Sequence, residues 1–285
     1  MSRQVFDRQQ VRRAFDRAAG QYDRFAVLQH EVSKRLLEKL DIVKLQPSWI
    51  LDAGSGTGSA IPGLFGRYRR AQLVALDLSE AMLRQAARHG GFLRSPHRVC
   101  ADIEQLPFAD DRFDLFFSSL SMQWCNDINT ALKEALRVLK PGGLLVFTTF
   151  GPDTLKELRH SWAQVDGDEH VNRFLDMHDI GDFLLADGFA EPVMEAERLT
   201  VTYDTVDALM HDLKAIGANV TASEAKQKGL LGRSALQTVR QAYEAFRENG
   251  VLPASYEVIY GHAWKPLQKK TGRPDTEQYV KFEQS

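Results

Sequence analysis

The sequence lacks most of the features that mark secreted, membrane or nucleic-acid-binding proteins. It has only two cysteines among 285 residues, Cys100 and Cys125, which excludes a disulfide framework and indicates a reducing compartment. No apolar run is long enough to span a bilayer, and residues 2–8 lack the apolar core of a signal peptide. The formal net charge is only −2, so the whole molecule has no field that would attract nucleic acid or an anionic membrane. We therefore expect a cytoplasmic protein that binds neither.

Metal-binding and repeat patterns are also missing. The eight histidines are scattered, with no paired spacing typical of metal ligands, so we expect no metal site. The sequence contains no internal repeat and no low-complexity segment. What remains is an ordinary globular composition, 44% hydrophobic and 26% charged, with enough apolar material for a sizeable core.

The most informative stretch is residues 50–58, Ile-Leu-Asp-Ala-Gly-Ser-Gly-Thr-Gly. An apolar run that ends in Asp52 and then in Gly54, Gly56 and Gly58 is typical of a buried strand that turns sharply into a helix. Glycine adopts positive φ without steric cost and lets backbone N–H groups approach a ligand at the helix N-terminus. The G-x-G-x-G spacing differs from the G-x-G-x-x-G of dinucleotide sites, so we favour a ligand with one nucleoside and an amino-acid carboxylate. The alternative is a tight turn that binds nothing.

An acidic residue ends the next predicted strand. The strand 72–77 finishes in Asp77, where a carboxylate can accept hydrogen bonds from both hydroxyls of a ribose. Ser79 is predicted to cap the following helix, whose first turn includes Met82. We expect Leu78 and Met82 to contact the same ligand as Asp77.

Two later segments complete a nucleoside-binding pattern. Past a third strand, Asp102 and Ile103 could hold an adenine amino group and one face of its ring. A fourth buried strand begins at residue 114, and Ser118 is expected to reach the ligand from its end. The predicted cofactor-binding residues are therefore Asp52, Gly54, Gly56, Gly58, Asp77, Leu78, Met82, Asp102, Ile103 and Ser118.

Strands and helices alternate between residues 48 and about 150, which predicts an α/β sheet built with parallel crossovers. Residues 1–45 read as an N-terminal helical cap with two apolar stripes. A helix over 128–139 is predicted to stop at the Lys-Pro-Gly-Gly of residues 140–143, before a fifth strand.

The second half of the chain is less regular. Residues 192–203 and 255–264 alternate well enough to be strands. They flank a helical insertion near 205–250, which we interpret as a lid over the edge of the sheet where α/β proteins bind ligands. Residues 1–265 would then form one domain, and residues 266–285 a loosely ordered tail.

The order of these markers resembles class I S-adenosylmethionine-dependent methyltransferases over residues 48–150. Three further stretches look like the malonyl-[acyl-carrier protein] O-methyltransferases of biotin synthesis. They are 15–23 (FDRAAGQYD), 118–125 (SSLSMQWC) and 150–159 (FGPDTLKELR), although Ser119 departs from the asparagine of many relatives. The resemblance implies a Rossmann-like class I methyltransferase fold, with a mostly parallel seven-stranded sheet, N-terminal helices and the helical lid insertion.

The resemblance also implies a reaction. It would be transfer of a methyl group from S-adenosyl-L-methionine to the free carboxylate of a malonyl group on acyl-carrier protein, leaving S-adenosyl-L-homocysteine. Such a carboxylate is already ionised at neutral pH, which explains why no general base is evident. We expect Arg159 to grip the carboxylate and Tyr22 to close the pocket and donate a hydrogen bond. The alternatives are a solvated Arg159 and a core Tyr22, while Gln123 and Trp124 could line the pocket or only pack a turn.

A carrier protein is an acidic partner by the same resemblance, so the insertion should be basic. It contains five basic residues, Lys214, Lys226, Lys228, Arg233 and Arg240, between positions 213 and 240. We expect a monomer. Two other functions stay open. One is methylation of a free small carboxylic acid. The other is a non-catalytic assembly factor with a methyltransferase fold, and the intact glycine loop and Asp77 disfavour this second function.

Overall fold

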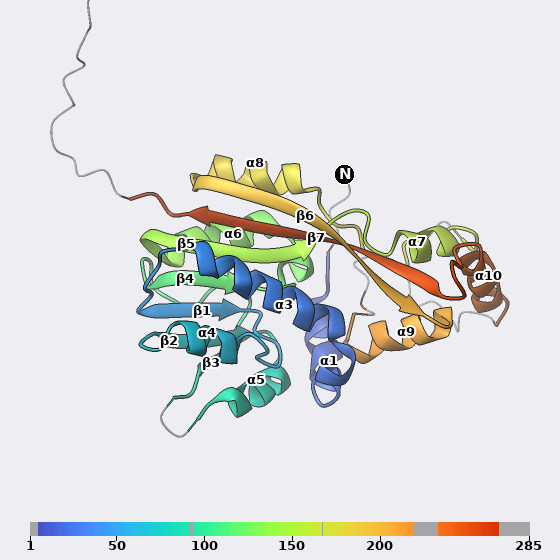
Figure 1. The fold of residues 1–285 in the computed structure, drawn as a ribbon, viewed down its shortest axis with the longest axis horizontal. Coiled ribbons are helices and arrows are strands. Elements are labelled where there is room, and N and C mark those ends of the chain that lie inside the picture. The colour runs from blue at the N-terminus through green and yellow to red at the C-terminus, as the bar shows by residue number, and fades with distance from the viewer. Residues whose placement is uncertain (1–4, 92–93, 167, 219, 221–232, 268–285) are drawn as a thin grey trace, which may run out of the picture.

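The computed structural model describes residues 5–91, 94–166, 168–218, 220 and 233–267. Its centre is one seven-stranded sheet with the order β3-β2-β1-β4-β5-β7-β6 (Figure 1). The first five strands pair in parallel, whereas β7 is antiparallel to both β5 and β6. The strands are β1 (Trp49–Ala53), β2 (Gln72–Asp77), β3 (His97–Cys100), β4 (Phe113–Ser118), β5 (Leu139–Phe150), β6 (Ala190–Tyr203) and β7 (Leu252–Trp264). This arrangement confirms the predicted fold class.

Helices cover both faces of the sheet, so the central strands are apolar along their whole length. Ile50 and Leu115 face a core beneath α3 and α4, while Leu51 and Phe116 face a second core beneath α6 and α8. The helices are α1 (Arg8–Ala18), α2 (Tyr22–Phe25), α3 (Val27–Lys39), α4 (Ile61–Arg67), α5 (Glu80–Ala86), α6 (Ile128–Val138), α7 (Lys156–Trp162), α8 (Met177–Asp187), α9 (Val206–Ala215) and α10 (Arg233–Glu244). The short 3₁₀ helix η3 (Met122–Trp124) follows β4.

The Lys-Pro-Gly-Gly segment was predicted to separate a helix from the next strand, but it lies inside that strand. Helix α6 ends at Val138, but β5 already begins at Leu139 and runs through the segment. The pairing of β4 with β5 shifts register between Phe113 and Leu115, and Gly142 has a φ of +78°. The glycine therefore forms an irregularity inside the strand, where a residue with a side chain would be strained.

The insertion between β6 and β7 contains two described helices, α9 and α10. Helix α9 lies beside the N-terminal helices, since the rings of Phe25 and His211 meet edge to face at 5.4 Å. A Cβ atom on Gly217 would lie 3.3 Å from the main chain of Ala14. The N-terminal cap and the end of α9 thus meet over the same edge of the sheet (Figure 1). Most of the predicted tail, residues 268–285, lies outside the described residues.

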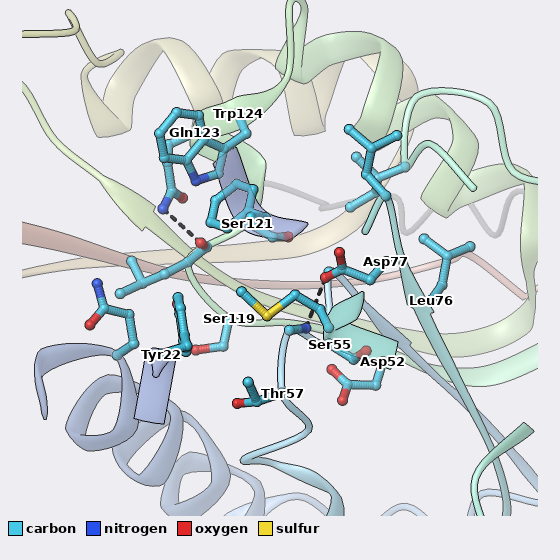
Figure 2. A pocket seen from close by; sticks show the side chains of 18 of the residues that line it. Tyr22, Asp52, Ser55, Thr57, Leu76, Asp77, Ser119, Ser121, Gln123 and Trp124 are labelled. Carbon is cyan, nitrogen blue, oxygen red and sulfur yellow. Dashed lines mark hydrogen bonds between the residues drawn. The ribbon is translucent and has the colours of Figure 1, made fainter. Parts of the chain in front are cut away.

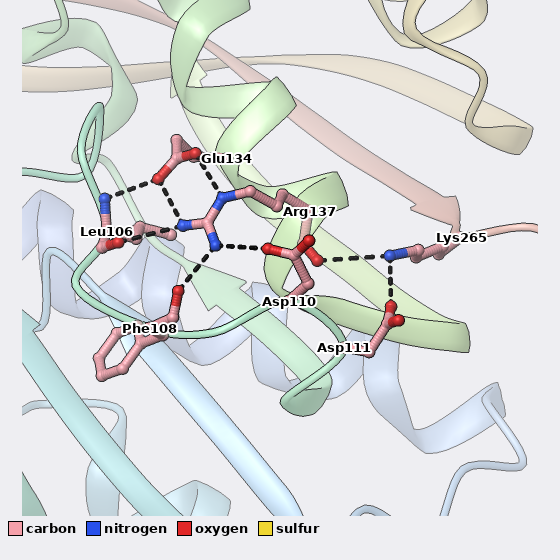
Figure 3. A network of polar contacts seen from close by, with 7 residues as sticks. All are labelled: Leu106, Phe108, Asp110, Asp111, Glu134, Arg137 and Lys265. Atoms are coloured by element: carbon pink, nitrogen blue, oxygen red, sulfur yellow. Dashed lines mark hydrogen bonds and ion pairs between the residues drawn. The ribbon is translucent and has the colours of Figure 1, made fainter.

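Arg137 anchors the long loop between β3 and β4 (Figure 3). Its guanidinium donates to the carbonyl oxygens of Leu106 and Phe108 and pairs with Asp110 and Glu134. The hydrogen bond from Arg137 also lowers the pKa of the Glu134 carboxyl. This network holds the loop that begins with the predicted adenine-binding residues. None of the helices in the described part of the chain is long and apolar enough to cross a membrane.

Candidate active site

A cavity lies where β1, β2 and β4 end, beneath the N-terminal helices, and we call it the loop cavity (Figure 2). The glycine loop forms its floor, because Gly54 N and Ser55 N donate to the carbonyl oxygen of Leu76 at 2.7 and 2.9 Å. Gly56 N donates to Asp77 Oδ2 at 2.9 Å. These bonds fold the loop back over the end of β2. The residues that line it include Arg8, Val11, Phe15, Tyr22, Gln29, Ser33, Asp52, Gly54, Gly56, Asp77, Leu78, Met82, Asp102, Ile103, Ser119, Ser121, Gln123 and Trp124.

The three loop glycines have positive φ, as predicted, but they serve different purposes. A Cβ on Gly54 would lie 2.2 Å from Cβ of Ser121, and one on Gly58 would lie 2.9 Å from Cα of Ala86. Gly58 is absent from the residues that line the cavity, so the structure gives it a packing role against α5 instead of a ligand contact. A Cβ on Gly56 would meet nothing within 4 Å, because this residue faces the open cavity.

Two carboxyl groups stand beside the loop, Asp52 fully buried and Asp77 half-buried. Asp77 Oδ1 accepts from Ser79 N at 2.8 Å, and burial raises the pKa of Asp77 to about 6 although its backbone hydrogen bonds oppose that shift. Asp52 is only 2% exposed, and its Oδ2 has no hydrogen-bond partner. Burial, together with the charge of Asp77, raises the pKa of Asp52 to about 8. An unsatisfied buried carboxyl of this kind is suited to receive a cationic or hydrogen-bond-donating ligand.

These shifts predict how the stability of the free protein depends on pH. In the unfolded chain Asp52 ionises near its ordinary pKa of 3.8, whereas the folded protein keeps it protonated up to about 8. Because the unfolded state binds fewer protons in this window, the free energy of unfolding should fall as pH rises through it. Replacing Asp52 with Asn should remove that contribution and raise stability at pH 8 by roughly 2–5 kcal/mol. Thermal unfolding of both proteins from acidic to alkaline pH measures the effect, and parallel curves would contradict it.

The other predicted nucleoside contacts are brought together on the opposite wall. Leu78, Met82, Asp102 and Ile103 all line the loop cavity. Arg8 closes this wall from α1, with its Nε 2.9 Å from Asp102 Oδ2 and a second ion pair to Glu104. No sequence pattern indicated Arg8 as a site residue, although the apolar stripe of α1 indicated a helix that packs by one face.

Tyr22, which we expect to close the pocket, lies in the wall of the loop cavity. Burial, with the charges of Asp77 and Asp23, raises the pKa of the Tyr22 phenol, so its hydroxyl stays protonated and can donate. Asp23 in the same helix accepts a hydrogen bond of 2.5 Å from the Thr57 hydroxyl. This bond ties α2 directly to the glycine loop.

Ser118, the last residue of β4, is not among the residues that line the loop cavity. It is fully buried, and its Oγ is 2.7 Å from the Oγ of Ser121. Its contact with Ser121 joins the end of β4 to the residues that follow the strand. Ser119 and Ser121 are the serines at the cavity, and Ser121 was not predicted.

A second cavity adjoins the first, and we call it the apolar cavity. Its walls are mostly apolar and include Phe150, Leu155, Leu158, Val171, Phe174 and Tyr256. Six residues line both cavities, namely Gln29, Gln123, Trp124, Phe150, Ile216 and Ala218. Gln123 and Trp124 therefore face the passage between the two cavities. Gln123 is steadied by a hydrogen bond of 2.6 Å from its Nε2 to the carbonyl oxygen of Leu120.

Arg159 lies away from this passage. It lines a third cavity with Trp162 and His170, and it is absent from the walls of the loop and apolar cavities. Its guanidinium donates to the carbonyl oxygens of Pro152, Thr154 and Asn172 at 2.9, 3.0 and 3.4 Å. Burial lowers the pKa of this guanidinium. To hold a carboxylate in the passage, Arg159 would have to leave these main-chain partners.

The sheet order, the glycine loop after β1 and the carboxylate at the end of β2 define a class I methyltransferase. A family described as a methyltransferase domain matches residues 51–147. The chain belongs to the malonyl-[acyl-carrier protein] O-methyltransferase family. A member from Methylovorus sp. is 53% identical, with 98% of this chain and 95% of that protein covered, and one from Laribacter hongkongensis is 50% identical over 94% and 93%.

Solved structures show the same fold at lower identity. The YcgJ protein from Bacillus subtilis has a TM-score of 0.57 at 18% identity, with 83% of this chain and 99% of that chain covered. Phosphoethanolamine N-methyltransferase 2 from Haemonchus contortus, solved with S-adenosyl-L-methionine, has a TM-score of 0.51 at 19% identity, with 82% of this chain and 52% of that chain covered.

Proposed function

We propose that this chain transfers a methyl group from S-adenosyl-L-methionine to the free carboxylate of malonyl-[acyl-carrier protein], giving the methyl ester that enters biotin synthesis. The observation that carries the proposal is the shared wall between the loop cavity and the apolar cavity. One cavity has the loop and carboxylates suited to a nucleoside with an amino-acid end, and the other suits an acyl arm.

The residues of the loop cavity fit this cofactor. Gly56 leaves space that a Cβ would occupy, and the unpartnered Oδ2 of Asp52 can receive an ammonium group. Asp77 would accept hydrogen bonds from the ribose hydroxyls, while Asp102 and Ile103 would hold the adenine. When bound, the cofactor supplies a methyl group on an electrophilic sulfonium. The protein then has to exclude water and align the acceptor oxygen, and no residue has to remove a proton from an ionised carboxylate.

The direct test is an assay of methyl transfer to malonyl-[acyl-carrier protein], with malonyl-coenzyme A and free malonate as comparators. We expect turnover on the carrier-bound substrate to exceed that on free malonate. Turnover of the free acid alone would support the alternative of a small-carboxylate methyltransferase. Cofactor binding without transfer to any of the three would support a non-catalytic assembly factor.

The carrier protein would meet the surface above the cavities. Of the predicted basic patch, Lys214 is exposed on α9, whereas Arg240 is engaged in a forked ion pair with Asp207. Arg233 begins α10, and Lys226 and Lys228 lie outside the described residues. Three exposed arginines of the adjoining N-terminal helices, Arg13, Arg17 and Arg24, extend the basic surface next to α9. We include them with Lys214 in the proposed docking surface.

Charge reversal tests this surface. The triple change Arg17→Glu, Arg24→Glu and Lys214→Glu should raise KM for malonyl-[acyl-carrier protein] about tenfold or more, because it removes long-range attraction to an acidic partner. Turnover of malonyl-pantetheine, which lacks the carrier, should stay unchanged. Reversal of Arg69 and Arg70, exposed in the turn before β2 at the opposite edge of the sheet, is the matched control. Equal losses in both variants would exclude the proposed surface.

We also propose that the protein acts as a monomer in the cytoplasm. Cys100 and Cys125 are both free thiols, which supports a reducing compartment.

A further inference from the structure

Helix α3 presents two unsatisfied polar side chains to the cavities. Gln29 lines the passage between the loop and apolar cavities, and within the described part of the chain its amide makes no hydrogen bond. Ser33, one turn further along the same face, lines the loop cavity, is only 3% exposed and has no partner for its Oγ. Ser33 Oγ is thus a buried polar atom without a partner, which is uncommon in native proteins, and the half-buried Gln29 amide beside it is free to bind a polar ligand.

The charges around the passage are unusual for a carboxylate site. Among the described residues that line either cavity, only Arg8 and His170 have side chains that can carry a positive charge. Arg8 is paired with Asp102 and Glu104, and His170 Nε2 is 2.9 Å from Asp166 Oδ1. An incoming carboxylate would therefore find neutral donors at the passage instead of an unpaired side-chain cation.

We propose that the Gln29 amide binds the acceptor carboxylate, while the sulfonium of the bound cofactor supplies the positive charge that attracts it. This inference rests on the proposed function. One carboxylate oxygen accepts an N–H of Gln29, which leaves the other oxygen free to attack. That oxygen forms a bond to the methyl carbon as the carbon–sulfur bond breaks, and the electron pair of the broken bond stays on sulfur. The step consumes one positive and one negative charge and moves no proton, so a neutral ester and a neutral thioether result.

Substitution of Gln29 is the first test, with malonyl-pantetheine as the acceptor and the full chain as the enzyme. Gln29→Glu keeps the shape but places a like charge against the carboxylate, so KM should rise at least about tenfold. Gln29→Leu should raise KM less, since it removes a donor without adding repulsion. In both variants the Kd for S-adenosyl-L-homocysteine and the Tm should stay at wild-type values. Gln10→Glu, which adds the same charge on the exposed side of α1, is the matched control.

The outcomes separate this inference from the proposed function. A wild-type KM in Gln29→Glu would overturn the role of Gln29 while leaving the methyltransferase assignment intact. Failure of the wild-type enzyme to methylate any malonyl thioester would instead remove the proposed function. If Gln29→Glu does not fold, an unchanged KM in Gln29→Leu would overturn the role by itself.

A binding measurement tests whether the cofactor supplies the positive charge that attracts the acceptor carboxylate. The unreacted malonyl thioester should bind at least about tenfold more tightly to the enzyme saturated with sinefungin, whose amine places positive charge near the methyl position, than to the enzyme saturated with S-adenosyl-L-homocysteine. Equal affinity in the two complexes would show that a protein cation neutralises the acceptor, and would overturn this part of the proposal. Calorimetric titration of both complexes distinguishes the results.

Discussion

Replacing Gly56 with leucine should weaken S-adenosyl-L-methionine binding by roughly 100-fold or more, or about 3 kcal/mol. Gly56 lines the loop cavity, and apart from its neighbours in the chain no protein atom lies within 4 Å of the position that its Cβ would take. A leucine there would project into the ligand site instead of clashing with the protein. At a φ of +54°, the side chain should add only the usual left-handed strain, about 1–2 kcal/mol of stability. Calorimetric titration with the cofactor measures the loss.

Gly188 provides the matched control for this strain. It ends α8 with a φ of +93°, a Cβ there would also meet nothing within 4 Å, and it lies outside both cavities. Gly188→Leu should lower the Tm about as much as Gly56→Leu and leave cofactor affinity unchanged. Wild-type affinity in Gly56→Leu would contradict the assignment of the loop, and equal loss of affinity in both variants would point to a general effect of destabilisation.

Replacing Asp77 with alanine should have an effect of similar size, again roughly 100-fold on cofactor affinity. Its carboxylate organises the site in two ways, because it accepts hydrogen bonds from Gly56 N and Ser79 N and faces the cavity where a ribose would lie. The alanine variant should lose the ribose contacts and also release the glycine loop from the end of β2. S-adenosyl-L-homocysteine should be affected as strongly as S-adenosyl-L-methionine, since both carry the same ribose.

Asp114 is the control for loss of a carboxylate that binds main-chain donors. It accepts from Ser48 N and Trp49 N at 2.9 and 2.8 Å, at the start of β1 and therefore at the opposite edge of the sheet. Asp114→Ala should lower stability while cofactor affinity stays at the wild-type value. Unchanged affinity in Asp77→Ala would exclude a ribose contact at this carboxylate.

The parallel half of the sheet could be predicted because its residues carry a local signal. Strands such as β2 are buried on both faces, so they appear in the sequence as uninterrupted apolar runs bounded by turn residues. The predicted cap at Ser79 is confirmed, with its Oγ accepting from Met82 N, because capping depends on residues only three positions apart. The fifth strand was predicted after the Lys-Pro-Gly-Gly segment, and its true start at Leu139 was missed. A Pro-Gly-Gly segment normally ends an element, and here the strand is extended by pairing of Leu139 with β4 and of Gly142 and Gly143 with Lys265.

Some residues of the candidate site could likewise be predicted from local sequence, and others could not. Asp77 and Gly56 could be identified from their spacing in the sequence. The burial of Ser118 instead depends on which residues pack against the end of β4 in the folded protein. The pairing of Arg8 with Asp102 joins segments nearly one hundred positions apart, and no local pattern indicates it. The same applies to Arg159, whose two terminal guanidinium nitrogens donate to carbonyl groups that the sequence does not identify.

The sequence by itself determined the sheet, the glycine loop and the acids at its edge, because each depends on backbone preferences and burial over a few neighbouring residues. Only the tertiary structure decided which side chains meet at the passage between the cavities. Gln29 comes from a helix that precedes β1, and Ile216 from the insertion after β6. Their meeting depends on how helices pack over the sheet, which is a property of the whole core and not of any segment.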